Sequence, residues 1–205
     1  MIPESVPTPD RLRQAAAELF AERGFAGTSM ADLAERVGVA KASLYNYYPS
    51  KEDLLFDLLR RGLEAWLTCC VGALDLGGSC EERLRRLVEE ALRFTSEHRD
   101  AVALFRLAAI QIGGELGDRV CFEVRAMHSV LRSRVMGEFA GAIERGEIAP
   151  ADPEDLAAFL RAFVTGLQFQ KMACAGEQEF ADERLPALWA IFWRGVRGEA
   201  MEVTG

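Results

Sequence analysis

The sequence predicts an all-α protein of about nine helices, and three observations lead to this fold class. Apolar residues recur at steps of three and four along most of the chain, which is the period of an amphipathic helix. No segment alternates apolar and polar residues as a half-buried strand would. Half of the 205 residues are hydrophobic, which is enough for a folded core and excludes intrinsic disorder.

The chain is expected to contain three regions. Residues 1–9 carry three prolines and little periodicity, which predicts a flexible tail. Residues 10–50 have the spacing of three short helices, and residues 51–205 have the spacing of a larger helical domain. The individual helices follow from their apolar faces and from the residues at their ends.

The first helix is expected from Asp10 to Arg23. Gly24 is a stop signal, because glycine readily adopts the left-handed conformation that ends helices. The apolar positions of this helix share one face. They are Leu12, Ala16, Leu19 and Phe20.

The second helix is short and has clear ends. Thr28 and Ser29 are suitable N-caps. Asp32 lies three residues after Ser29, which is the spacing of a capping box. Gly38 is expected to end the helix. Its apolar face carries Met30, Leu33, Ala34 and Val37.

The third helix is expected from Lys41 to Tyr47. Pro49 ends it, because the residue before a proline is disfavoured in the helical conformation. Leu44 and Tyr48 are four residues apart and can face the core of this region. The other positions are then largely outward. They are Lys41, Ser43, Tyr45, Asn46 and Tyr47.

Longer helices fill the rest of the chain. Capping sequences that begin at Ser50, Ser79 and Asp152 predict three of their starts. The expected segments are residues 51 to about 74, a helix after Ser79 that includes Leu92, residues about 99–111, residues about 115–145, a helix after Asp152 that includes Leu167, and a last helix that carries Leu185 to Val196.

Charge and hydropathy limit the classes of protein that remain. The net charge of −8 excludes a uniformly basic nucleic-acid-binding surface, although a local basic patch is compatible with it. The first residues lack the basic and apolar regions of a secretory signal. The longest uncharged apolar run, Ala65 to Leu74, is much shorter than the roughly 20 residues that span a membrane. We therefore expect a cytoplasmic protein with no membrane partner.

No catalytic or metal-binding motif is present in the sequence. It lacks the signatures of serine hydrolases, nucleotide-binding loops and zinc peptidases, so we expect no catalytic residues, no cofactor and no enzymatic activity. No C-x-x-C pair or nearby histidine suggests a metal site. The cysteines are expected to be reduced and to fill small spaces in the core. They are Cys69, Cys70, Cys80, Cys121 and Cys174.

The stretch from Thr28 to Lys51 gives the strongest indication of function. Two short amphipathic helices joined by a glycine-containing turn are typical of a helix-turn-helix. Residues 40–51 contain two positive charges and no acidic residue, in a protein that is acidic as a whole. Hydroxyl, ammonium and amide groups on one exposed helix suit phosphate oxygens and base edges. A solvated helix with partly buried tyrosines is the alternative interpretation.

From Gly38 to Leu54 the sequence follows the pattern G-V-x-x-x-[ST]-L-Y-x-x-[FY]-x-x-K-x-x-L. With its flanking residues, the segment 11–55 resembles the N-terminal domain of TetR-family transcriptional repressors. The resemblance covers about a quarter of the chain. The remainder is similar to the family in the number and order of its helices. Tyr48 stands where the family more often has Phe, which fits a packing role.

The resemblance implies that residues 10–50 form a DNA-binding domain. Thr28 and Ser29 would donate hydrogen bonds to phosphate at the positive end of the second helix. Lys51 matches a lysine that contacts phosphate. Within the recognition helix, Lys41 and Asn46 are the candidates for reading bases. The recognition helix as a whole carries Lys41, Ser43, Tyr45, Asn46 and Tyr47.

One short recognition helix reads only a few base pairs, so a helix-turn-helix protein needs two such helices about one turn of DNA apart, roughly 34–36 Å. We therefore expect a homodimer on double-stranded DNA. The last two long helices carry more large apolar residues than one bundle face needs. Pairing these helices between two subunits would give a four-helix bundle. Packing within one chain is the alternative. The candidate interface residues are Leu156, Phe159, Phe163, Leu188, Trp189 and Phe192.

In the family that the chain resembles, a small-molecule effector binds inside the larger domain, here residues 51–205. An effector that prefers one conformation changes DNA affinity by its difference in affinity for the two states. The candidate lining is mostly apolar, which favours a hydrophobic effector, and simple core packing is the alternative for each residue. The candidates are Trp66, Cys70, Phe94, Phe105, Phe122, Met127, His128 and Met172.

These observations predict a TetR-like homodimeric regulator, a repressor that binds a palindromic operator and is released by a small effector. The alternative is a helical ligand-binding or protein-interaction module that does not bind DNA. Activation of transcription instead of repression stays open, because the direction of regulation depends on where the operator lies relative to the promoter.

Overall fold

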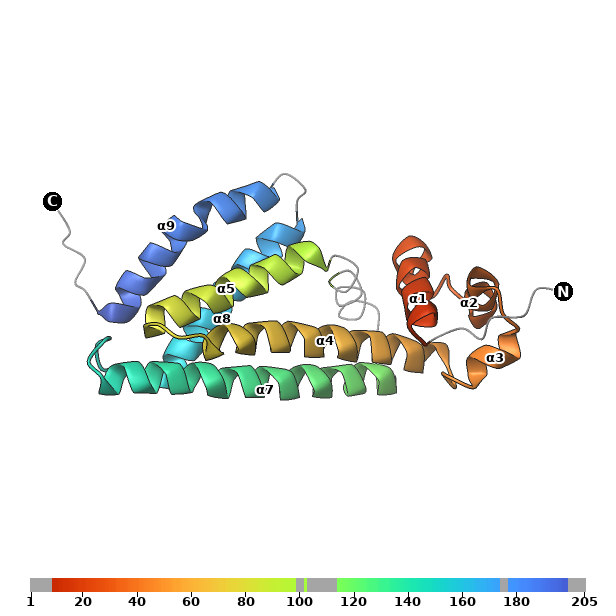
Figure 1. The fold of residues 1–205 in the computed structure, drawn as a ribbon, viewed down its shortest axis with the longest axis horizontal. Helices are drawn as coiled ribbons and strands as arrows, with labels where there is room; N and C mark the ends of the chain where they lie inside the picture. The colour runs from red at the N-terminus through yellow and green to blue at the C-terminus, as the bar shows by residue number, and fades with distance from the viewer. Residues whose placement is uncertain (1–8, 99–101, 103–113, 174–176, 199–205) are drawn as a thin grey trace. The chain divides into compact units, whose positions relative to one another are not determined.

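The described residues form eight α-helices and no β-strand, which confirms the predicted all-α class (Figure 1). The computed structural model describes residues 9–98, 102, 114–173 and 177–198. For residues 172, 173 and 177–182 it describes the backbone only. Apart from residue 102, the expected helix at residues 99–111 lies outside this part of the chain. The helices are α1 (Pro9–Arg23), α2 (Met30–Val37), α3 (Lys41–Tyr45), α4 (Lys51–Asp75), α5 (Cys80–Glu97), α7 (Gly114–Glu144), α8 (Pro153–Ala173) and α9 (Glu177–Arg197).

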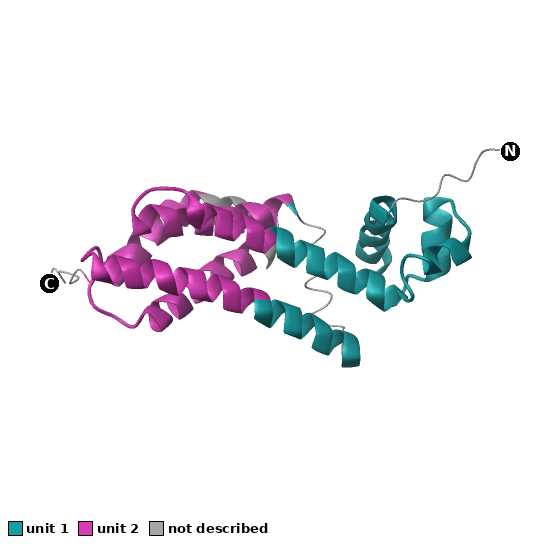
Figure 2. Cartoon of the chain, turned by 60° about the horizontal axis from the view of Figure 1, so that its bottom comes forward, with its two compact units in different colours: residues 1–65, 98–126 teal, residues 66–97, 127–205 magenta. Residues whose placement is uncertain are grey.

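The chain divides into two units (Figure 2). Unit 1 comprises residues 1–65 and 98–126, and unit 2 comprises residues 66–97 and 127–205. The long helices α4 and α7 each begin in unit 1 and end in unit 2.

The ends of the short helices in unit 1 follow the predicted signals. Ser29 caps α2, with its Oγ accepting a hydrogen bond from the backbone N–H of Asp32 at 3.2 Å. The backbone N–H of Ser29 donates in return to the Asp32 carboxylate at 2.7 Å, which completes the capping box. Gly24 and Gly38 have φ angles of +73° and +77° after α1 and α2, the left-handed conformation that glycine adopts at low cost.

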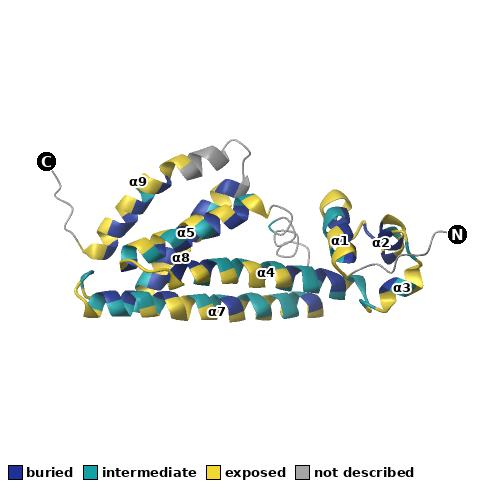
Figure 3. Cartoon of the chain, in the orientation of Figure 1, coloured by how far each residue is buried: buried dark blue, intermediate teal, exposed yellow. Residues whose placement is uncertain are grey.

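The core of unit 1 is made by the predicted apolar faces of α1 to α3 and by the first turns of α4 (Figure 3). Complete burial of a Leu or Phe side chain stabilises a fold by about 1.5–3 kcal/mol, so this small unit depends on a few large side chains. Those with almost no exposed surface are Leu12, Leu19, Phe20, Leu33, Leu44, Leu54 and Leu55.

In unit 2, α8 packs against both α5 and α9. Capping sequences begin two of these helices as predicted: the backbone N–H of Ser79 donates to Glu82 at 2.8 Å, and that of Glu154 donates to Asp152 at 2.8 Å. Phe139 of α7 is fully buried in the core. The inward face of α5 is buried throughout and carries Leu84, Leu87, Val88, Ala91 and Leu92.

The cysteines differ in their environments. Cys70 and Cys80 are fully buried, and this burial raises the pKa of each thiol to about 12. Cys121 is exposed, so the expectation of a core role is wrong for this residue. The described helices include none long and apolar enough to cross a membrane.

Candidate nucleic-acid interface and ligand pocket

The helix α3 is shorter than predicted and ends at Tyr45 instead of Tyr47. The backbone N–H groups of Tyr47 and Tyr48 both donate to the carbonyl oxygen of Leu44, at 2.9 and 3.0 Å. This tight turn replaces the last helical turn before Pro49. Leu44 is fully buried and fixes the inner side of α3 in the core of unit 1.

The polar side chains of Lys41 and Tyr45 are exposed on the outer side of α3, and Asn46, the C-cap of the helix, is exposed as well. Tyr45 retains 45% of its surface, and the Lys41 Nζ lies 5.9 Å from the centre of its ring. Ser43 is half-buried. Tyr47 is also half-buried and packs against the core of unit 1, so the expectation that its side chain faces outward is wrong.

Thr28 lies inside unit 1 and is only 1% exposed. Its hydroxyl oxygen lies 2.9 Å from the carbonyl oxygen of Gly24 and 3.2 Å from that of Leu19, and donates to these groups at the end of α1. In this conformation the hydroxyl fixes the loop between α1 and α2 instead of facing a phosphate.

Ser29 is exposed at the start of α2, but its polar groups are engaged by Asp32. The Ser29 hydroxyl donates to the Asp32 carboxylate at 2.5 Å. Hydrogen bonds from the side chain and backbone of Ser29 lower the pKa of Asp32, so the carboxylate is charged at neutral pH. A phosphate that approaches this helix end meets the negative charge of Asp32, which already accepts from the Ser29 backbone N–H.

Lys51 connects the start of α4 to the loop between α1 and α2. Its Nζ donates to the carbonyl oxygens of Phe25 and Thr28 at 2.7 and 2.8 Å. The same ammonium group lies 4.2 Å from the centre of the Phe25 ring. Because an ammonium group has three donors, one N–H is left for a phosphate oxygen.

A polar network that the sequence analysis missed surrounds Tyr48. The Tyr48 hydroxyl donates to the Asp57 carboxylate of α4 at 2.6 Å and accepts from the Arg13 guanidinium of α1 at 3.2 Å. Asp57 also accepts from Arg60 and Arg61, each at 3.1 Å. The network joins α1, the segment after α3 and α4. The pairs of Asp57 with Arg60 and Arg61 follow helical spacing, but the contacts of Tyr48 with Arg13 and Asp57 span 35 and 9 residues and follow no such pattern.

The network determines how two of its members titrate. Burial raises the pKa of Tyr48, and its hydrogen bond to Asp57 raises it further. Burial opposes ionisation of Asp57, but the hydrogen bonds from Tyr48, Arg61 and Arg60 outweigh it and lower the pKa of the carboxyl group. Tyr48 is therefore a neutral donor and Asp57 a charged acceptor at neutral pH.

Replacing Tyr48 by Phe is expected to destabilise the protein by about 1–3 kcal/mol, because the partly buried Asp57 loses a donor. Urea unfolding followed by circular dichroism measures this change. Tyr47→Phe is the matched control, because the Tyr47 hydroxyl has no hydrogen-bond partner among the described residues. Equal stability of the two variants would contradict the role assigned to the network.

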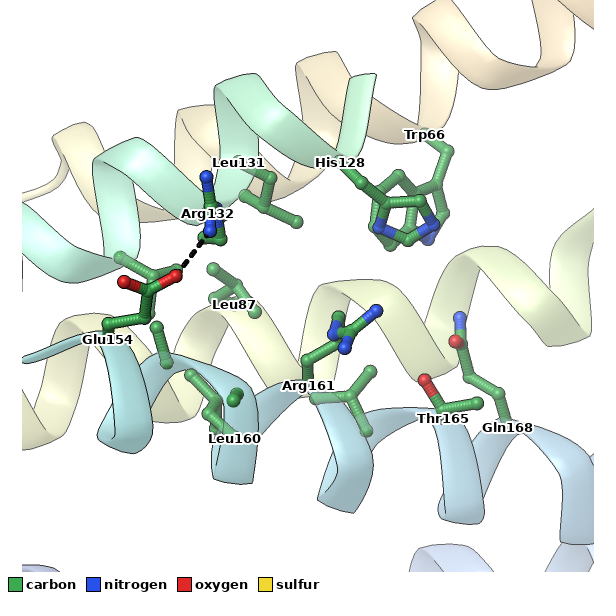
Figure 4. A pocket seen from close by; sticks show the side chains of 14 residues that line it. Trp66, Leu87, His128, Leu131, Arg132, Glu154, Leu160, Arg161, Thr165 and Gln168 are labelled. Atoms are coloured by element: carbon green, nitrogen blue, oxygen red, sulfur yellow. Dashed lines mark hydrogen bonds and ion pairs between the residues drawn. The ribbon is translucent and has the colours of Figure 1, made fainter. Parts of the chain in front are cut away.

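Unit 2 contains a pocket of about 170 Å³ between α4, α5, α7 and α8 (Figure 4). Its polar lining includes Arg161, Thr165 and Gln168 on α8. An ion pair between Arg132 and Glu154, 2.6 Å apart, lies on another part of the wall. The apolar lining includes Leu87, Leu131, Val135, Ala157, Leu160 and Val164.

Two of the residues predicted to line an effector site, Trp66 and His128, line this pocket. Their rings are in contact, with centres 6.2 Å apart. Burial lowers the pKa of His128, and the nearby charge of Arg161 lowers it further, so the imidazole is neutral at pH 7.

Four of the other predicted residues do not line this pocket. Cys70, Phe94 and Met127 are buried away from it, because periodicity identifies an inward side chain but not the space beside it. Phe122 is 71% exposed. The described side chains do not include those of Phe105 and Met172. The sequence did not indicate the polar residues of α8 in the pocket wall, because polar residues on a helix usually face solvent.

The residues proposed for a dimer surface differ in burial. Trp189 and Phe192 are each 3% exposed and belong to the core of their own chain. Phe159 is 52% exposed and stacks on Phe192, with ring centres 4.9 Å apart. Leu156, Phe163 and Leu188 are half-buried at the edge of the same core. Two exposed residues that the prediction did not include are Phe169 and Ile191, at 67% and 69%.

An all-helical chain whose first unit displays a short helix after a glycine turn has the architecture of helix-turn-helix regulators. Residues 12–58 match the family described as "Bacterial regulatory proteins, tetR family". The HTH-type transcriptional regulator RutR of Escherichia coli K12 is 28% identical over 142 residues, 69% of this chain and 65% of RutR. The chain thus matches less than two thirds of the length of RutR.

Two further comparisons extend this result. YezE of Bacillus subtilis strain 168, an uncharacterised HTH-type transcriptional regulator, is 30% identical over 135 residues, 62% of this chain and 70% of YezE. The structure of AibR in complex with isovaleryl coenzyme A and operator DNA has a similar fold, with a TM-score of 0.65 and 23% identity over 88% of this chain and 97% of AibR. The chain belongs to the TetR family of bacterial regulatory proteins.

Proposed function

We propose that this protein is a homodimeric transcriptional repressor that binds a palindromic operator and releases it when a small molecule occupies unit 2. The outward side of α3 is the observation that supports this function best: Lys41, Tyr45 and Asn46 are exposed while Leu44 is held in the core. Residues 10–50 would bind DNA, and residues 51–205 would bind the effector and the second subunit. The structure of AibR in complex with isovaleryl coenzyme A and operator DNA supports the proposal that a protein of this fold binds both a small ligand and an operator.

The exposed groups of α3 divide by chemistry. Lys41 and Asn46 can donate to base edges in the major groove, and Asn can also accept from them. Tyr45 can position the helix through the phosphate backbone. The third N–H of Lys51 adds a phosphate contact at the start of α4. The net charge of −8 keeps the remaining surface away from DNA, which suppresses binding at random sites.

A small number of phosphate contacts predicts a moderate dependence on salt. We expect weak binding to a duplex of random sequence at low salt, with log K falling by roughly 0.9 per phosphate contact for each unit of log salt. Fluorescence anisotropy of a labelled duplex across a salt series measures this slope. Absence of binding at every salt concentration would favour the alternative, a helical ligand-binding or protein-interaction module.

The second subunit is proposed to pack on α8 and α9. Exposed apolar side chains lie on both helices, Phe159 and Phe169 on α8 and Ile191 on α9, and Phe159 stacks on Phe192 of the core. Burying them against their copies in a second chain would remove apolar surface from water and form a four-helix interface. A two-fold dimer also matches the symmetry of a palindromic operator.

A further inference from the structure

Of the two arginines that line the pocket in unit 2, only one forms an ion pair with a carboxylate among the described residues. Arg132 is neutralised by Glu154 at 2.6 Å. Arg161 lines the same pocket, and the described residues place no carboxylate within 4.0 Å of its guanidinium. A guanidinium group is always charged at neutral pH. The wall therefore presents one net positive charge, in a protein that is acidic as a whole.

Other polar groups accompany Arg161 on one side of the pocket (Figure 4). Thr165 and Gln168 follow Arg161 by four and seven residues, so all three lie on one face of α8. His128 lies across from them and is neutral, because burial lowers its pKa. A neutral imidazole has one N–H donor, and the Thr165 hydroxyl is another. The donor groups of Arg161, His128 and Thr165 thus surround the same part of the pocket.

The rest of the wall is apolar and the space is small. Its volume of about 170 Å³ is close to the ~150 Å³ of an apolar protein cavity that holds one benzene molecule. The space fits a compact apolar body of roughly six to ten non-hydrogen atoms. Trp66 supplies an aromatic surface beside His128. The aliphatic contacts are made by Leu87, Leu131, Val135, Leu160 and Val164.

We propose that the ligand of this pocket is a small organic acid with one carboxylate and a compact aromatic or branched alkyl body. The carboxylate pairs with Arg161 and accepts from His128 or Thr165, because a planar guanidinium matches the two oxygens of a carboxylate. The apolar body lies against the aliphatic wall and Trp66. The regulatory meaning of this binding rests on the proposed function, whereas the binding itself depends on the pocket alone.

Matched pairs of acids and amides test the proposal. Phenylacetate and 4-methylpentanoate are compared with phenylacetamide and 4-methylpentanamide by isothermal titration calorimetry on the full chain. We expect the acids to bind roughly tenfold to a hundredfold more tightly than the amides, because a charge-assisted hydrogen bond is stronger than a neutral one. Tryptophan fluorescence should change with the acids, and Trp66→Phe should remove that change.

Variants of Arg161 separate the charge from the shape of the pocket. Arg161→Gln should lower the affinity for the acids to that for the amides. Arg161→Lys should keep most of the preference for acids. Arg161 is exposed, so neither variant should alter the melting temperature. Arg134→Gln removes an exposed arginine of α7 outside the pocket and should bind like the wild type.

The results also distinguish this proposal from the proposed function. Equal binding of acids and amides, or no binding of either acid to the wild type, overturns the ligand class. A protein that binds DNA in the salt series but shows no preference for acids keeps the regulator function and loses only this assignment. A protein that binds the acids but no DNA keeps the assignment and loses the regulator function.

Discussion

Replacing Lys41 and Tyr45 together by alanine is expected to weaken operator binding by at least about a hundredfold while the protein stays folded. Contacts of this kind to bases and phosphates contribute roughly 1–3 kcal/mol each, and a dimer loses both contacts twice. Both side chains are exposed, so their removal leaves the core of unit 1 intact. Leu44 continues to hold α3 in place.

The affinity is measured by anisotropy on an inverted repeat found beside the coding region, or on a duplex selected from random sequences by the wild type. Arg85→Ala with Glu89→Ala is the matched control, since it removes two exposed side chains of α5 in unit 2 that pair at 3.0 Å. The control should bind DNA normally. Wild-type affinity of the α3 variant, with an unchanged melting temperature, would exclude α3 as the DNA-reading element.

The second large effect concerns the assembly. Phe159→Asp with Ile191→Asp is expected to convert the dimer into a folded monomer, because an unpaired carboxylate buried in an apolar interface costs several kcal/mol. Both side chains are more than half exposed within one chain, so the fold of the monomer tolerates the charges. Operator affinity should fall with dimerisation. Sedimentation velocity at micromolar concentration measures the change in mass.

Phe122→Asp is the control for this experiment. Phe122 is an even more exposed aromatic residue, at 71%, but it lies on α7 in unit 1. This variant should sediment as the wild type does. A wild-type monomer, or a dimer that survives both aspartates on α8 and α9, would show that these helices pack only within their own chain.

Local signals explain why the ends of the helices could be predicted. Gly24, Gly38 and Ser29 act through their own backbone or through a neighbour three or four residues away, and such interactions are fixed by sequence spacing. The apolar faces could be predicted for the same reason. Tyr47 could not, because its burial depends on the turn that ends α3 two residues early.

The candidate sites could be predicted only in part. The exposed chemistry of Lys41 and Asn46 follows from the periodicity of one short helix. The contacts of Lys51 with Phe25 and Thr28 span 26 and 23 residues of sequence and arise only when the helices pack. The pocket depends even more on packing, since a cavity is a space that neighbouring helices leave unfilled. The sequence alone therefore does not indicate that Arg161 lines a pocket.

The position of Lys51 constrains which amino acids can replace it. One small, roughly spherical ammonium group reaches two carbonyl oxygens and lies over the face of the Phe25 ring. A guanidinium is flat and spreads its donors along a fork, so arginine could not satisfy both oxygens from the same place. An exchange usually regarded as conservative would here separate the loop before α2 from α4, even though the positive charge is retained.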